Sequence, residues 1–217
     1  MELFSKGSYK KIDKNFLIEG AEVLSEVSKI QEKYNKKDTD TFINELHDSL
    51  VGYYLGYELV NTNKHGFDCK KSRTEDVFLE VKAASYMANS WQATFNDTNY
   101  EKADSFKLKN VYLCLAVWKD AGELLFLVYG QNKEIGEFLH NKVDEFKVDH
   151  KQVRSTQSIS LQSLVFDYDF EIITINKTKE EILKLLTLKN RRFTYLQDNK
   201  ILNLKEYYEK YNISVKD

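Results

Sequence analysis

Val77-Phe78-Leu79-Glu80-Val81-Lys82-Ala83-Ala84 is a stretch with a strong β-strand pattern. Successive side chains of a strand point to opposite faces. The apolar residues at odd-numbered positions therefore share one face, whereas Glu80 and Lys82 are neighbours on the other. Two charges on a central strand are costly to bury unless they are paired or bind an ion. The stretch predicts both a core strand and a charged functional site.

The segments around this strand predict an α/β fold. Amphipathic helices are expected over residues 16–34 and 41–55, before short strands at 57–62 and 67–70, and the segment 85–100 reads as polar and irregular. Further on we expect helices at 101–109, 132–146, 179–188 and 204–211, strands at 111–118, 124–129, 159–164 and 170–175, and a hairpin over 192–202. This order indicates a mixed central β-sheet flanked by α-helices.

Length and composition favour a soluble, cytoplasmic protein of one domain. The chain has 217 residues, 42% of them hydrophobic and 30% charged, which argues against disorder. Residues 1–14 have no apolar segment typical of a signal peptide, and no run is long enough to span a membrane. Cys69 and Cys114 are far apart and form no metal-binding pattern. The net charge of −2 is unusual for a protein that binds nucleic acid, but the basic residues are clustered.

A third charge precedes the strand. Asp68 lies twelve residues before Glu80, across an expected irregular hairpin that can bring the two carboxylates together. Neighbouring carboxylates repel, and a divalent cation such as Mg²⁺ relieves the repulsion while keeping waters for a phosphate substrate. Lys82 beside the ion could position or deprotonate a water, or stabilise developing charge. Two acids and a lysine around Mg²⁺ are an arrangement for phosphodiester hydrolysis.

Three motifs in order resemble the PD-(D/E)-X-K nuclease superfamily, with its restriction-endonuclease-like fold: Phe42-Ile43-Asn44-Glu45-Leu46, Gly66-Phe67-Asp68 and Leu79-Glu80-Val81-Lys82-Ala83. Phe67 replaces the nominal proline. The resemblance implies one nuclease domain over residues 1–217, with a catalytic core at about 41–146 and a C-terminal elaboration at about 150–217. It also implies that Asp68, Glu80 and the Val81 carbonyl hold Mg²⁺, that Lys82 acts on the water, and that Glu45 supports a second metal or a water.

The acid on the first core helix could be Glu45 or Asp48. The expected apolar stripe centres near Leu46, so that Glu45 flanks the stripe while Asp48 points toward solvent. The stripe comprises Phe42, Leu46, Leu50 and Tyr53. We therefore favour Glu45. The small residues Ser49, Gly52 and Gly56 lie on the same side of the helix as Glu45. They either let a DNA strand approach the helix closely or pack against the next β-strand of the protein.

Three polar segments are candidates for contacts with DNA bases. Residues 85–100 follow the catalytic strand and contain amides that can pair with adenine: Asn89, Gln92 and Asn96. The second candidate contains Arg154 and Gln157, and the third is residues 189–192. Each of these segments could also be a plain polar loop.

The resemblance and the size of the chain favour a type II restriction endonuclease. Such enzymes cut double-stranded DNA at specific sites, usually as homodimers, and a DNA methyltransferase is the expected genetic partner. One alternative is a structure-specific nuclease of the same fold, acting in repair or on junctions. Another is a non-catalytic DNA-binding protein with a degenerate nuclease fold.

Overall fold

The computed structural model describes residues 39–59, 67–72, 74–120, 122–150 and 155–213, with isolated helical positions between 23 and 33. The chain divides into two compact units, residues 1–46 and 47–217. Most of the helix expected at 16–34 lies outside the described residues, and the single nuclease domain stays a prediction. In the part of the chain that is described, no helix combines the length and apolar character needed to cross a bilayer.

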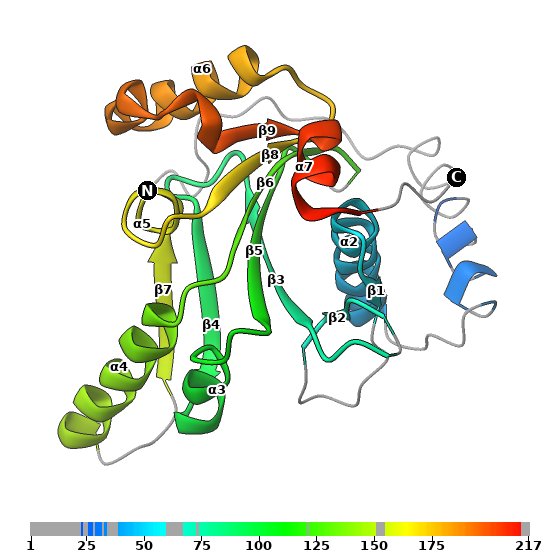
Figure 1. The fold of residues 1–217 in the computed structure, drawn as a ribbon. Helices are drawn as coiled ribbons and strands as arrows, with labels where there is room; N and C mark the ends of the chain where they lie inside the picture. Colours follow the sequence, from blue (N-terminus) through cyan, green and yellow to red (C-terminus); the bar gives the residue numbers. More distant parts are fainter. Residues whose placement is uncertain are drawn as a thin grey trace, which may run out of the picture. The chain divides into compact units, whose positions relative to one another are not determined.

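The second unit is built on a seven-stranded mixed sheet (Figure 1) with the order β1-β2-β3-β5-β6-β8-β9. The β3–β5 and β8–β9 pairs are parallel, and the other neighbouring pairs are antiparallel. This confirms the expected mixed sheet. The strands are β1 (Glu58–Leu59), β2 (Cys69–Lys70), β3 (Phe78–Ser85), β5 (Val111–Trp118), β6 (Leu124–Gly130), β8 (Glu171–Thr174) and β9 (Ile201–Asn203).

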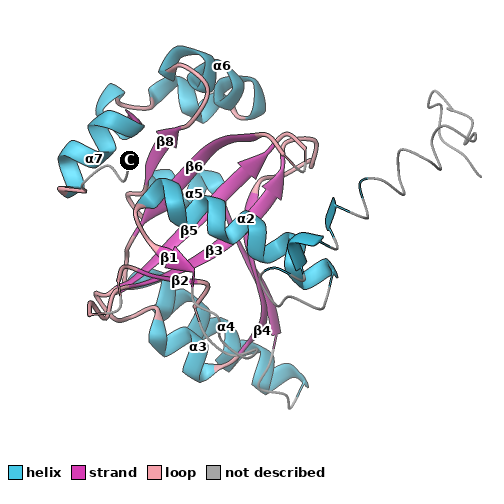
Figure 2. Cartoon of the chain, turned by 90° about the vertical axis from the view of Figure 1, so that its right-hand side faces the viewer, coloured by secondary structure: helices cyan, strands magenta, loops and turns pink. Residues whose placement is uncertain are grey.

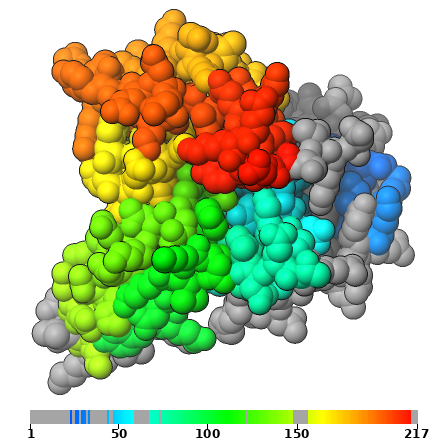
Figure 3. Space-filling view, viewed as in Figure 1, coloured from blue at the N-terminus to red at the C-terminus, as the bar shows by residue number. Residues whose placement is uncertain are grey.

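Helices flank both faces of the sheet. They are α2 (Thr39–Leu55), α3 (Tyr100–Ser105), α4 (Glu134–His150), α5 (Leu161–Phe166), α6 (Lys179–Lys189) and α7 (Leu204–Tyr211). The second half of α2 crosses one face (Figure 2), where Val51 and Leu55 share a hydrophobic cluster with Tyr207 of α7. Buried residues of α3 to α6 form the cluster on the opposite face. Figure 3 shows α6 and α7, in orange and red, above α3 and α4 in green.

A separate two-stranded antiparallel ribbon, β4 (Gln92–Thr98) with β7 (Ser155–Ser160), lies beside the main sheet. The expectation of an irregular segment at 85–100 is therefore wrong. Buried Trp91, Ala93 and Phe95 alternate with polar residues there, which is the period of a strand. The strand expected at 159–164 is also wrong, because Ser160 ends β7 and caps α5 by accepting a hydrogen bond from the Ser163 N–H.

The hairpin expected over residues 192–202 is also wrong. Two short 3₁₀ helices, Arg191–Tyr195 and Asp198–Lys200, occupy this segment before β9. The Asn190 side chain accepts a hydrogen bond from the Arg192 N–H at 2.9 Å, and Phe193 is buried. The cap and the buried ring favour a helical turn over the expected hairpin.

Candidate active site

The two charged side chains of β3 lie together on one face of the strand, as its alternation predicts. Leu79 and Val81 are buried in the cluster under α2. Glu80 is only 5% exposed, and the Lys82 Nζ lies 2.6 Å from its Oε1. The same Nζ lies 5.9 Å from the ring centroid of Phe95 in β4. The ion pair thus sits between β3 and the ribbon, largely out of water.

Asp68 joins this site because β2 pairs with β3 over only two residues, Cys69 with Leu79 and Lys70 with Phe78. Where the pairing stops, the Asp68 Oδ2 accepts a hydrogen bond from the Val81 N–H at 2.7 Å. The N–H and C=O of one strand residue point to the same edge, so the Val81 carbonyl faces this side too. The end of β2 therefore places a carboxylate and a carbonyl beside Glu80.

The Asp68 carboxyl is perturbed by its surroundings. Burial, and then the charge of Glu80, raise the pKa of Asp68 to about 6, although Lys82 and Lys102 oppose this shift. Burial lowers the pKa of Lys82, but the charges of Glu80, Asp68 and Asp48 outweigh that effect and raise its pKa overall. Lys82 is consequently protonated at neutral pH, and the site holds two carboxylates whose repulsion a dication would reduce.

Asp48 belongs to the electrostatic environment of this site. Its side chain is half-buried, and its charge raises the pKa of Lys82. The expectation that Asp48 faces solvent is therefore wrong, because the buried side of α2 was misplaced. Leu50 and Tyr53 of the expected stripe are 42% and 59% exposed, whereas Val51 and Leu55 are fully buried. These buried residues follow Asp48 at helical spacing and so share its side of α2.

Gly52 explains how closely α2 approaches β2. A Cβ at Gly52 would lie 2.8 Å from the Cys69 Sγ, so at this position the small residue serves packing against the next strand. The Cys69 thiol also donates a hydrogen bond to the backbone carbonyl of Asp48, with 3.5 Å between Sγ and the oxygen. The Glu45 side chain lies outside the described side chains, and its role stays a prediction.

Lys102 is a site residue that sequence reasoning missed. Its Nζ lies 3.3 Å from the same Glu80 Oε1 that binds Lys82. The Lys102 backbone N–H donates to the Asn99 Oδ1 at 2.8 Å, which fixes the start of α3. The helix was expected, but nothing in the sequence indicates that its lysine reaches β3. Two ammonium groups therefore share one buried carboxylate oxygen.

We expect Lys102→Ala to lower the Mg²⁺ concentration that half-saturates the site by roughly three- to tenfold, because an ammonium group that competes for Glu80 is lost. The melting temperature over a Mg²⁺ titration would measure the shift. Lys107→Ala is the matched control, since Lys107 pairs with Asp104 at 2.6 Å instead. A half-saturating Mg²⁺ concentration that rises in Lys102→Ala would contradict the assignment.

The residues present fit a magnesium ion. Among the described residues no group of three or more His, Cys, Asp or Glu side chains forms a complete metal-ligand set. Asp68, Glu80 and the Val81 carbonyl offer oxygen ligands, and Mg²⁺ is commonly held by one or two carboxylates with water in its other positions.

The predicted DNA-contacting residues are placed differently from one another. Gln92 and Asn96 are exposed on β4, and Asn89 is exposed in the turn before it. Gln157 pairs across the ribbon with buried Phe95 and is itself half-buried, so it lies on the inner side. Arg154 lies outside the described residues.

No protein-family model matches this sequence, and no curated protein matches it either. The functional argument accordingly rests on the geometry of Asp68, Glu80, Lys82 and their neighbours.

Proposed function

We propose that the chain is a Mg²⁺-dependent endodeoxyribonuclease with a restriction-endonuclease-like core. One observation carries the proposal: Asp68, Glu80 and Lys82 converge where β2 separates from β3, with the Asp68 carboxylate held by the Val81 N–H at 2.7 Å. A surface ion pair would leave Glu80 in water, but Glu80 is 5% exposed. Burying these charges without a function is costly.

Each residue has a role in the proposed hydrolysis. Asp68, Glu80 and the Val81 carbonyl would hold Mg²⁺, which supplies positive charge to the scissile phosphate. Lys82 would donate hydrogen bonds that orient the attacking water and stabilise charge that develops on the phosphate oxygens. Asp48, on the helix beside the site, is the acid we now favour over Glu45 for a supporting role, because its charge acts on Lys82.

Incubation of the purified chain with plasmid DNA and Mg²⁺ tests the proposal. Discrete fragments that disappear in EDTA would support a sequence-specific restriction enzyme acting on double-stranded DNA, and we then expect a homodimer and a neighbouring methyltransferase gene. Cleavage of branched DNA alone would favour a repair or junction nuclease of the same fold. Binding without any cleavage would favour a non-catalytic protein and would refute the nuclease assignment.

A further inference from the structure

We propose that the outer face of the β4–β7 ribbon, with the cationic segment Lys189–Arg192 at one end, docks into the major groove of double-stranded DNA and contacts base edges. The inference deepens the proposed nuclease function and rests on it. It assigns sequence recognition to one continuous surface, formed by three segments that are far apart along the chain.

The outer face is neutral and rich in hydrogen-bonding groups. In the ribbon, Gln92 faces Ser160 and Thr94 faces Ser158, with 3.2 Å between the Thr94 and Ser158 hydroxyl oxygens. Alternation adds Asn96 and Thr156 to this face, and all six residues except half-buried Thr94 are exposed. Amide and hydroxyl groups can both donate hydrogen bonds to base edges and accept hydrogen bonds from them. A two-stranded ribbon also fits the major groove.

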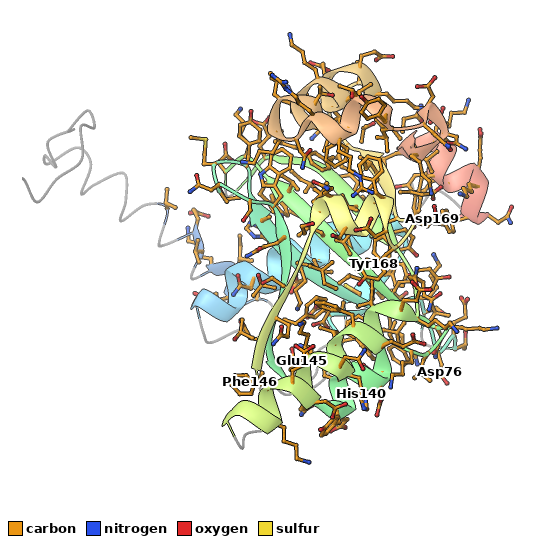
Figure 4. The ribbon with its side chains drawn as sticks, turned by 90° about the vertical axis from the view of Figure 1, so that its left-hand side faces the viewer. Asp76, His140, Glu145, Phe146, Tyr168 and Asp169 are labelled. Atoms are coloured by element: carbon orange, nitrogen blue, oxygen red, sulfur yellow. The ribbon has the colours of Figure 1, made fainter. Side chains whose placement is uncertain are left out.

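The inner face fixes the ribbon to the protein and so leaves the outer face to a partner. Ala93, Phe95 and Ile159 are buried in the hydrophobic cluster on this side of the sheet. Figure 4 faces this side of the molecule, where β7 runs from α5 toward the end of α4 near Phe146. The single acidic residue of the two strands, Asp97, lies where the pairing register shifts between Phe95 and Thr98. The regularly paired part of the outer face therefore carries no negative charge to repel phosphates, whereas Asn96 lies in the shifted part, next to Asp97.

Positive charge gathers at the end where β4 begins. The Lys189 Nζ donates to the Ala88 carbonyl and lies 4.9 Å from the Trp91 ring centroid. Arg192 pairs with Asp167 at 3.1 Å, just beyond α5. Within the described ranges, neither Lys189 nor Arg191 forms an ion pair. Uncompensated cations at the end of a neutral ribbon are complementary to the phosphates that border a DNA groove.

The acidic site lies behind the ribbon. The Lys82 Nζ lies 5.9 Å from the ring centroid of Phe95, which is buried on the inner face, whereas the neighbours of Phe95 in β4, Thr94 and Asn96, point to the outer face. A duplex on the outer face must therefore pass over an edge of the ribbon to reach the acidic site.

Selection from a randomised 30-base-pair duplex pool, with Ca²⁺ replacing Mg²⁺ to prevent cleavage, tests the surface independently of catalysis. We expect the wild-type chain to enrich a sequence motif. Gln92→Ala with Asn96→Ala should lose at least one motif position and roughly tenfold in affinity for the motif, with affinity for scrambled duplex unchanged. Lys189→Ala with Arg191→Ala should instead weaken binding to every duplex and reduce the salt slope by about 2.

Two controls match these variants: Asn199→Ala, an exposed amide away from the ribbon, and Lys184→Ala, an exposed lysine on the helix that carries Lys189. Failure to enrich any motif, failure to bind duplex DNA, or an unchanged motif in the double amide variant would each overturn the proposal. Motif binding by a chain that never cuts DNA would leave the surface supported and the nuclease function refuted, so the two failures are distinguishable.

Discussion

Lys82→Ala is expected to reduce DNA cleavage by at least roughly 10²-fold while leaving the fold and DNA binding intact. Among the described residues its Nζ is the cation nearest to Glu80, at 2.6 Å, and a positioned group that acts on the water contributes about 10²–10⁴-fold in rate. Lys102, which lies 3.3 Å from Glu80 in the wild-type chain, is unchanged in this variant, so the buried carboxylate keeps a counter-charge. Single-turnover cleavage of plasmid DNA in saturating Mg²⁺ measures the loss, and DNA binding in Ca²⁺ reports the intact fold.

Lys70→Ala is the matched control, since Lys70 is also a strand lysine beside the site but pairs with Asp76 at 2.9 Å. We expect it to cut at a near wild-type rate. If Lys82→Ala cuts as fast as this control, Lys82 has no role in the chemistry and the assignment of the site is wrong.

Asp68→Asn is expected to abolish Mg²⁺-dependent cleavage yet stabilise the metal-free protein at alkaline pH. The pKa of Asp68 is raised to about 6 by burial and by Glu80. The folded state then binds more protons than the unfolded state between about pH 4 and pH 6, so stability falls as the pH rises through that window. The asparagine amide cannot ionise, so the variant avoids the cost of a buried charge. Its side-chain oxygen can still accept the hydrogen bond from the Val81 N–H. We expect a gain in the free energy of unfolding on the order of 2 kcal/mol at pH 8, discounted for partial exposure of the group.

Denaturant unfolding at pH 4 and at pH 8, in EDTA, measures this difference. The gain should be present at pH 8 and nearly absent at pH 4, where the Asp68 carboxyl of the wild-type chain is itself protonated. Glu80→Gln should also lose cleavage, because it removes the other carboxylate that would hold the ion. An equal effect of Asp68→Asn at both pH values would show that ionisation of the buried Asp68 carboxyl is not its cause.

Strand β3 could be predicted from sequence because two independent signals agree there. Alternation placed Glu80 and Lys82 on one face. The apolar residues Leu79 and Val81, which alternate with them, predicted a buried strand, and both are buried in the structure. The partnership with Asp68 followed from the expected hairpin, although the detail that positions it, the early end of β2 pairing, is a property of the backbone. Local patterns are reliable where periodicity, charge and burial point to the same arrangement.

Other features depend on tertiary contacts that no local pattern encodes. β7 contains one buried apolar residue, Ile159, and is a strand because it pairs with β4. Lys102 reaches Glu80 only because the fold brings α3 beside β3. Asp48 was misplaced for a different reason: the buried side of α2 depends on Gly52 admitting Cys69 closely, so exposed Leu50 and Tyr53 gave a false apolar stripe.

The ribbon is assembled from two separate excursions of the chain. β4 lies in the connection from β3 to β5, and β7 lies in the connection from β6 to β8. Neither strand belongs to the seven-stranded sheet. Under the proposed DNA recognition, mutations on the outer face can therefore diversify target preference during evolution without altering the acids and lysine of the sheet. Facing positions such as Thr94 and Ser158, whose hydroxyls are 3.2 Å apart, would have to change together although 64 residues separate them in the gene.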